Sequence, residues 1–336
     1  MEDKNRIFFD DIGIIRGFCI ICILIGHSFA IYTGSSYWTL PSNVDNISIY
    51  KWINPCLTSF PLQIFVFISG YLFSHQQWCK TYKTLNYTIK KAKRILLPCL
   101  LFGIVYYLLI DRYKFGNVSI EYFLSGPGHL WFLPMIFCCY VVAKILWKYI
   151  GKPRVITFIT LFIIGCFSIY IPKLICIQNF ATYFIFFIIG AWCYSYKDTV
   201  LSYLNNNKNG LIICAGTLIL IIFNCYLYYN HVFNGSYVIR HGVKLLLGII
   251  GGISCLYIAN TEIINKNINV KFTRWNGWYG IYIYHQFILM IIYYNLPVYV
   301  INKYLLPFIA LIIGGILSYI LVKYTLKTKF GKWLIG

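Results

Sequence analysis

Long runs of apolar residues alternate with short polar stretches along the whole chain. The runs are about 17–25 residues long, and a helix of that length can cross a hydrocarbon core of about 30 Å. The fold class that we expect is all-α: a polytopic membrane bundle forming a single domain over residues 1–336, with no appended soluble domain. The ten predicted spans are 12–32, 56–74, 94–113, 130–147, 154–171, 180–196, 210–229, 242–259, 278–298 and 304–323.

Composition agrees with this pattern. Of the 336 residues, 60% are apolar and only 11% are charged, whereas a soluble globular domain carries about 25% charged residues. The first apolar run ends at Ser28-Phe29-Ala30 without a convincing small-residue cleavage site. We therefore interpret it as a retained helix and not as a cleaved signal peptide.

The net charge is +20, and what it indicates about function depends on where the basic residues lie. Lys and Arg are scattered through the loops, whereas a nucleic-acid binder gathers them on one exposed face, so we expect no nucleic-acid partner. Loops on one side of the ten spans carry about three times as many Lys and Arg as those on the other. This bias predicts that both termini are cytoplasmic. No internal repeat is evident, which argues against an inverted-repeat transporter.

Two ionisable residues lie in the first predicted span. Arg16 and His27 are eleven residues apart, which is about 1100° of helical rotation and about 16 Å of rise, so both share one helix face. Ionisable groups inside spans usually mark a site, and histidine is the commonest general base. The structural alternatives are that Arg16 reaches the inner headgroups and that His27 only makes an interhelical hydrogen bond.

A cluster of basic residues lies at the inner interface. Lys90, Lys91, Lys93 and Arg94 continue the second loop, on the side that the charge bias makes cytoplasmic. Such a cluster suits the phosphate groups of a cofactor. Contact with anionic lipids is the competing interpretation, and it requires no catalytic role.

Five further polar or aromatic residues are candidates for substrate contact or for stabilising a developing oxyanion. Ser69 lies at the end of the second span, and His129 and Trp131 open the fourth span on the outer side. Asn276 precedes the ninth span and His285 lies inside it. Trp131 also fits an ordinary aromatic belt, and His285 fits a structural role equally well. The sequence does not distinguish which of Ser69, His129 and Asn276 would be the oxyanion donor.

These motifs resemble the acyltransferase-3 family of bacterial membrane O-acyltransferases, including its fucose-4-O-acetylase-like branch. The resemblance covers roughly residues 10–290, and Gly13 stands where many members have an Asp. It rests on Arg16 and His27 with ten residues between them, Phe67-Ile68-Ser69-Gly70-Tyr71, Arg94-Ile95-Leu96-Leu97-Pro98, His129-Leu130-Trp131-Phe132 and Gly280-Ile281-Tyr282-Ile283-Tyr284-His285.

The resemblance implies transfer of an acyl group, most simply acetyl from acetyl-CoA, to a hydroxyl of a cell-surface glycan or lipid-linked sugar. The protein would lie in the bacterial cytoplasmic membrane and need no metal. The basic cluster, with Arg16, would hold the coenzyme phosphates, and His27 would act as general base or as transient acyl carrier. Two alternatives stay open: a carrier or exporter of a polar glycan or solute that uses Arg16 and His27 for binding, and an acyl-CoA-binding sensory module. The sequence does not determine the oligomeric state, and a homo-oligomer is one of the options.

Overall fold

The computed structural model describes residues 2–33, 47–76, 83–111, 119–229, 237–261, 275–295, 301–302 and 304–335. Every regular element in these ranges is a helix, which confirms the all-α prediction for them. Each of the ten predicted spans overlaps one long helix. These helices are α1 (Glu2–Ser28), α3 (Pro61–His75), α5 (Thr84–Tyr106), α8 (Phe132–Ile150), α9 (Val155–Phe167), α10 (Ile177–Ser195), α12 (Asn207–Tyr229), α13 (Tyr237–Ala259), α16 (Trp278–Asn295) and α17 (Leu306–Thr325).

Shorter elements lie between the long helices or, in the case of α18, after the last of them. They are η1 (Ala30–Thr33), α2 (Tyr50–Thr58), η2 (Tyr107–Asp111), α7 (Ile120–Ser125), η3 (Gly128–Trp131), η4 (Ser168–Tyr170), α11 (Lys197–Leu204) and α18 (Lys329–Ile335).

Within the described ranges, seven segments are long and apolar enough to cross a membrane on length and composition: Tyr50–His75, Thr84–Asp111, Gly128–Ile150, Ile177–Ser195, Asn207–Tyr228, Val238–Ala259 and Leu306–Thr325. Ile12–Ser28 and Val155–Tyr170 are shorter apolar helices. Helix α16 is in neither group because it is rich in tyrosine and also carries His285, Gln286 and Asn295. The predicted count of ten spans and the predicted orientation therefore stay predictions.

The chain divides into two compact units, and α1 and α5 each contribute residues to both. The first unit contains Met1–Cys19, Ser59–Lys93 and Met135–Arg274. The second contains Ile20–Thr58, Arg94–Pro134 and Trp275–Gly336. The prediction of a single domain is not tested by this division.

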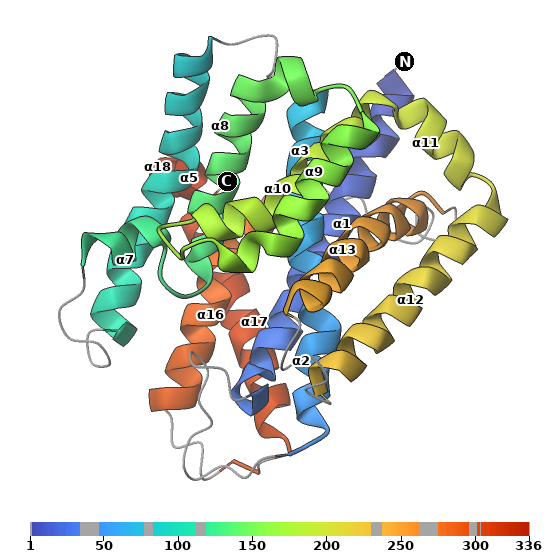
Figure 1. The fold of residues 1–336 in the computed structure, drawn as a ribbon. Coiled ribbons are helices and arrows are strands. Elements are labelled where there is room, and N and C mark those ends of the chain that lie inside the picture. The colour runs from blue at the N-terminus through green and yellow to red at the C-terminus, as the bar shows by residue number, and fades with distance from the viewer. Residues whose placement is uncertain are drawn as a thin grey trace. The chain divides into compact units, whose positions relative to one another are not determined.

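In the first unit, α3 and α10 pack at very short range. A Cβ on Gly70 would lie 1.8 Å from the carbonyl oxygen of Phe187, and a Cβ on Gly190 would lie 1.9 Å from that of Phe67. The two helices are therefore in backbone contact, which only glycine permits. Helices α12 and α13 also run side by side in this unit (Figure 1).

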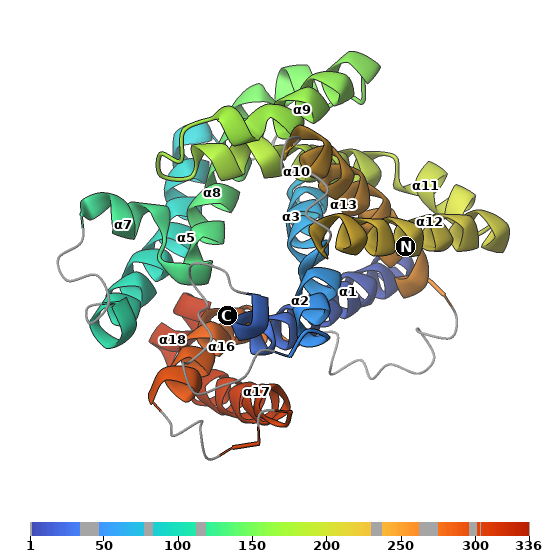
Figure 2. The same ribbon diagram turned by 60° about the horizontal axis from the view of Figure 1, so that its bottom comes forward.

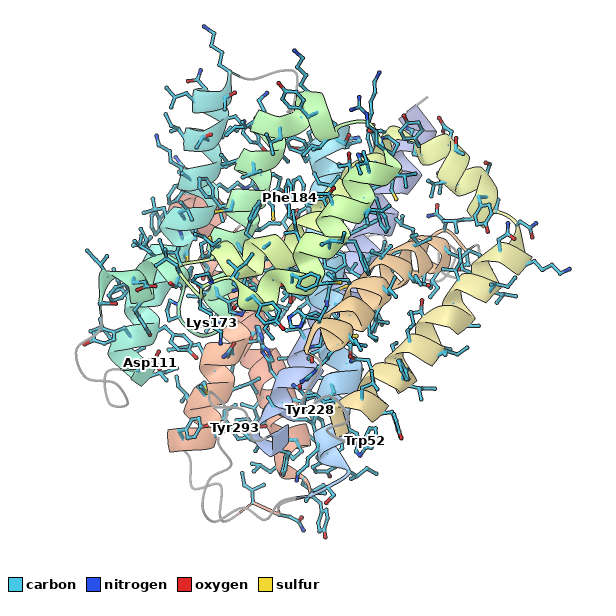
Figure 3. All side chains as sticks on the ribbon, viewed as in Figure 1. Trp52, Asp111, Lys173, Phe184, Tyr228 and Tyr293 are labelled. Carbon is cyan, nitrogen blue, oxygen red and sulfur yellow. The ribbon has the colours of Figure 1, made fainter. Side chains whose placement is uncertain are left out.

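In the second unit, α16 packs along α17, as Figure 2 shows. A Cβ on Gly280 would lie 2.6 Å from Cγ2 of Val322, so this close approach also requires glycine. The phenol of Tyr293, labelled in Figure 3, donates a hydrogen bond to the carbonyl oxygen of Ser28. This bond joins the end of α1 to α16.

Asp111, also labelled in Figure 3, is buried where η2 ends. Its carboxylate accepts a hydrogen bond from the phenol of Tyr122 in α7. Burial, followed by this hydrogen bond, raises the pKa of Tyr122 above its usual range. The pair connects the end of the α5–η2 segment to α7.

The structure corrects two local predictions. The basic stretch Lys90–Arg94 is not part of a loop, because α5 begins at Thr84 and includes it. The second predicted span is interrupted: α2 ends at Thr58 and α3 begins at Pro61. Proline is favoured at a helix start because it lacks the N–H that this position would leave unpaired.

Candidate active site

Three histidines from three helical segments of the second unit meet in one cluster. His27 is in the last turn of α1, His129 in η3 and His285 in the second turn of α16. The rings of His27 and His285 are stacked with their centroids 5.0 Å apart. The ring of His129 meets that of His285 edge-on at 5.2 Å. His129 and His285 are buried, with exposed fractions of 6% and 1%, and His27 is half-buried.

Hydrogen bonds assign the proton positions in the His27–His285 pair. Nδ1 of His285 lies 3.0 Å from the carbonyl oxygen of Ile281, which can only accept, so Nδ1 carries the hydrogen. Nε2 of neutral His285 is then an acceptor, and it lies 2.9 Å from Nδ1 of His27. His27 therefore donates through Nδ1, and in the neutral ring its Nε2 carries no hydrogen. This is the nitrogen that can take a proton.

The same reasoning applies to His129. Its Nε2 lies 3.1 Å from the carbonyl oxygen of Ile283 and must donate to it. Its Nδ1 is then a bare acceptor, and this buried atom has no hydrogen-bond partner among the described residues. The neutral ring therefore has no N–H left for an oxyanion. The geometry favours an acceptor role for His129 over the donor role that the sequence suggested.

Backbone contacts fix both ends of this cluster. The phenol of Tyr282 donates to the carbonyl oxygen of His129. The side-chain amide of Asn54 in α2 donates to the carbonyl oxygen of Gly26 at 2.7 Å, one residue before His27. A Cβ on Gly26 would lie 2.3 Å from Cγ2 of Thr58, so this glycine allows α2 to approach the end of α1.

The other candidates for substrate contact are Ser69, Trp131 and Asn276. Ser69 belongs to the first unit, and its hydroxyl donates to the carbonyl oxygen of Phe65 in its own helix at 2.8 Å. Trp131 is half-buried and meets the Phe132 ring edge-on at 6.5 Å. Asn276 is exposed in the turn before α16. Their predicted roles stay predictions.

The basic cluster divides according to exposure. Lys90, Lys93 and Arg94 are exposed on α5, whereas Lys91 is buried. The ammonium of Lys91 lies 3.6 Å from the ring centroid of Tyr140, within the range of a cation–π interaction. Lys91 thus has a packing role in the first unit, and the three exposed residues are the better candidates for a phosphate group.

Arg16 lies on α1, the same continuous helix as His27, as predicted. It is half-buried and belongs to the first unit. Arg94 belongs to the second unit, where it lies within electrostatic range of the phenol of Tyr279. Tyr279 is stacked on Tyr282, with ring centroids 6.3 Å apart. The ring of Tyr282 in turn meets the His129 ring edge-on, with the two centroids 5.0 Å apart.

Several residues of the site were not identified from the sequence. Asn54 could have been noticed as a polar residue just before an apolar run, but nothing marked its target. The carbonyl groups of Ile281 and Ile283 have no sequence signal at all. Among the described residues, no group of three or more His, Cys, Asp or Glu is arranged to hold a metal ion.

The family model of an acyltransferase domain, Acyl_transf_3, matches residues 9–324. The chain belongs to this acyltransferase family. The match covers nearly the whole sequence and includes the helices that carry all three clustered histidines. Neither the comparison with curated proteins nor that with solved structures finds a match. With its long apolar helices, the protein is a membrane acyltransferase.

Proposed function

We propose that this membrane acyltransferase transfers acetyl from cytosolic acetyl-CoA to a hydroxyl of a cell-surface glycan or lipid-linked sugar, with His27 as general base. The observation that carries the proposal is the hydrogen-bonded His27–His285 pair. Its proton arrangement leaves Nε2 of His27 as the basic nitrogen. A positioned base contributes about 10²–10⁴-fold to such a transfer.

The chemical step uses His27 twice. Nε2 takes the proton of the acceptor hydroxyl as the oxygen attacks the thioester carbonyl carbon. The tetrahedral intermediate collapses, the C–S bond breaks, and the sulfur leaves with the proton that His27 carries. His285 stabilises the transient His27 imidazolium because its Nε2 accepts from His27 Nδ1–H. In other enzymes with a nucleophile and a general base, a third group likewise orients the base.

The donor would be held from the α5 side of the second unit. Arg94 is exposed on α5, and its guanidinium is suited to bidentate binding of phosphate. The tyrosines of α16 would then line the way for the pantetheine arm to the histidines. In a bacterial cytoplasmic membrane, the predicted orientation places the basic cluster on the cytoplasmic side. This is the side on which the coenzyme is found.

The test uses purified protein in liposomes with acetyl-labelled acetyl-CoA and a panel of methyl glycosides. CoA release and label on the glycoside are followed for wild type, His27→Asn and Arg94→Ala. The Asn amide can still donate to His285 but provides no base, so we expect a loss of turnover of about 10²-fold or more. His75→Asn and Arg154→Ala are the controls, because His75 ends α3 and Arg154 is an exposed residue preceding α9.

Arg94→Ala should mainly raise the KM for acetyl-CoA, because it removes a phosphate contact far from the reacting carbonyl. If His27→Asn turns over normally, His27 is not the base. If acetyl-CoA is neither bound nor consumed with any glycoside, the proposed donor is wrong. Uptake of an unmodified glycoside into the liposomes, dependent on His27, would instead identify the carrier function.

A further inference from the structure

His129 has an acceptor atom for which the described residues provide no donor. Its Nε2 is used by the carbonyl oxygen of Ile283, and its Nδ1 is buried without a partner among the described residues. Buried polar atoms are almost always hydrogen-bonded, and exceptions often mark a functional site. An unpaired acceptor in this position indicates a ligand that brings an N–H or an O–H group.

The location of His129 restricts what that ligand is. His27 and His129 both lie against the ring of His285, at 5.0 and 5.2 Å. The ring centroids of His27 and His129 are therefore at most 10.2 Å apart, so a sugar whose reacting hydroxyl lies at His27 would bring a neighbouring group towards His129. In a sugar this group is the hydroxyl on the neighbouring carbon. The first amide N–H of a coenzyme A thioester is further along the chain from the reacting carbonyl.

We propose that His129 selects the acceptor by accepting a hydrogen bond from the hydroxyl adjacent to the one that is acylated. The substrate class is therefore a sugar with two neighbouring hydroxyls. This inference rests on the proposed function of His27. His129 is a specificity residue in this account: it holds the neighbouring hydroxyl and does not take part in the transfer of the proton.

Substrate analogues test the hydrogen bond directly. A methyl glycoside that accepts label is compared with its deoxyfluoro analogue, in which fluorine replaces the neighbouring hydroxyl and cannot donate. We expect kcat/KM to be about 10- to 100-fold lower for the fluoro analogue with wild type. In His129→Gln, whose amide can donate to Ile283 but offers no acceptor at the Nδ1 position, the two analogues should react at similar rates.

His129→Asn is the matched variant. Its amide oxygen lies near the position of Nδ1 and can accept the same hydrogen bond, so preference for the hydroxyl should return in part. A purely structural role of His129 would lower both rates together in both variants. Equal ratios of hydroxyl to fluoro turnover in wild type and His129→Gln would overturn the proposal.

A measurement that needs no turnover separates this proposal from the acyl-transfer function. In protein labelled with [¹⁵N]histidine, with His129→Gln for assignment, His129 Nδ1 should show the signal of an unprotonated nitrogen. The signal should move when the methyl glycosides are added and stay unchanged with the fluoro analogues. A protonated Nδ1 would refute the proposal, and so would the absence of a response to any glycoside at saturating concentration. A shift caused by acetyl-CoA alone would also refute it, because it would assign His129 to the donor. Absence of label transfer would refute the acyl-transfer function and leave this result intact.

Discussion

Substitution of His285 tests how much the hydrogen bond to His27 contributes to catalysis. His285→Phe keeps a ring that can stack on His27, where the present rings are 5.0 Å apart and inclined by 16°. It removes the acceptor that lies 2.9 Å from His27 Nδ1. When His27 is protonated in the transition state, this is a hydrogen bond from a charged donor to a neutral acceptor.

Hydrogen bonds to charged groups contribute about 1.5–3 kcal/mol. Since about 1.4 kcal/mol is a tenfold change in rate, His285→Phe should lower kcat by about 10- to 150-fold. The KM for acetyl-CoA should change little, because the hydrogen bond strengthens only as the proton moves. The assay is label transfer at saturating acetyl-CoA and glycoside, with protein amount normalised by a fluorescence signal on size-exclusion chromatography.

The control is His285→Gln. Its side-chain oxygen lies near the position of Nε2 and can accept the hydrogen bond from His27, so kcat should stay within a few-fold of wild type. If the Phe variant is as active as wild type, or if the Gln and Phe variants lose the same activity, His285 does not orient His27 and the reasoning fails.

Two further predictions concern the first unit. Gly70→Ala should destabilise the protein by about 1–3 kcal/mol or more, because the new Cβ would lie 1.8 Å from the Phe187 carbonyl oxygen. The destabilisation is measured by thermal unfolding in detergent. The control Gly216→Ala should be neutral or stabilising, because a Cβ at that position meets nothing within 4 Å. Equal midpoints for the two variants would contradict the α3–α10 packing. The thiols of Cys138 and Cys176 are 3.3 Å apart, so copper phenanthroline with oxygen as electron acceptor should oxidise them to a disulfide, detected as a linked peptide by mass spectrometry. If both remain alkylatable after this treatment, the arrangement of α8 and the start of α10 is wrong.

Much of the fold follows from local properties of the sequence. Each long apolar run was expected to be a helix, because a helix is the structure that satisfies its backbone polar groups within one segment and without water, and each predicted span overlaps one. Arg16 and His27 were correctly placed on one helix, since their spacing alone decides that. The boundaries were less well predicted: Lys90–Arg94 continues α5 although its charges suggested a loop.

The sequence also named the three histidines of the site but could not bring them together. His27, His129 and His285 are separated by more than a hundred residues from one another, and their meeting depends on how α1, η3 and α16 pack. The roles of their nitrogens depend on still finer detail. The carbonyl oxygens of Ile281 and Ile283 decide which ring nitrogens of His285 and His129 carry a hydrogen. Every residue has the same backbone carbonyl, so no sequence pattern predicts this role. Residue identity determined which chemistry was available, and the tertiary structure decided which nitrogen donates and which accepts.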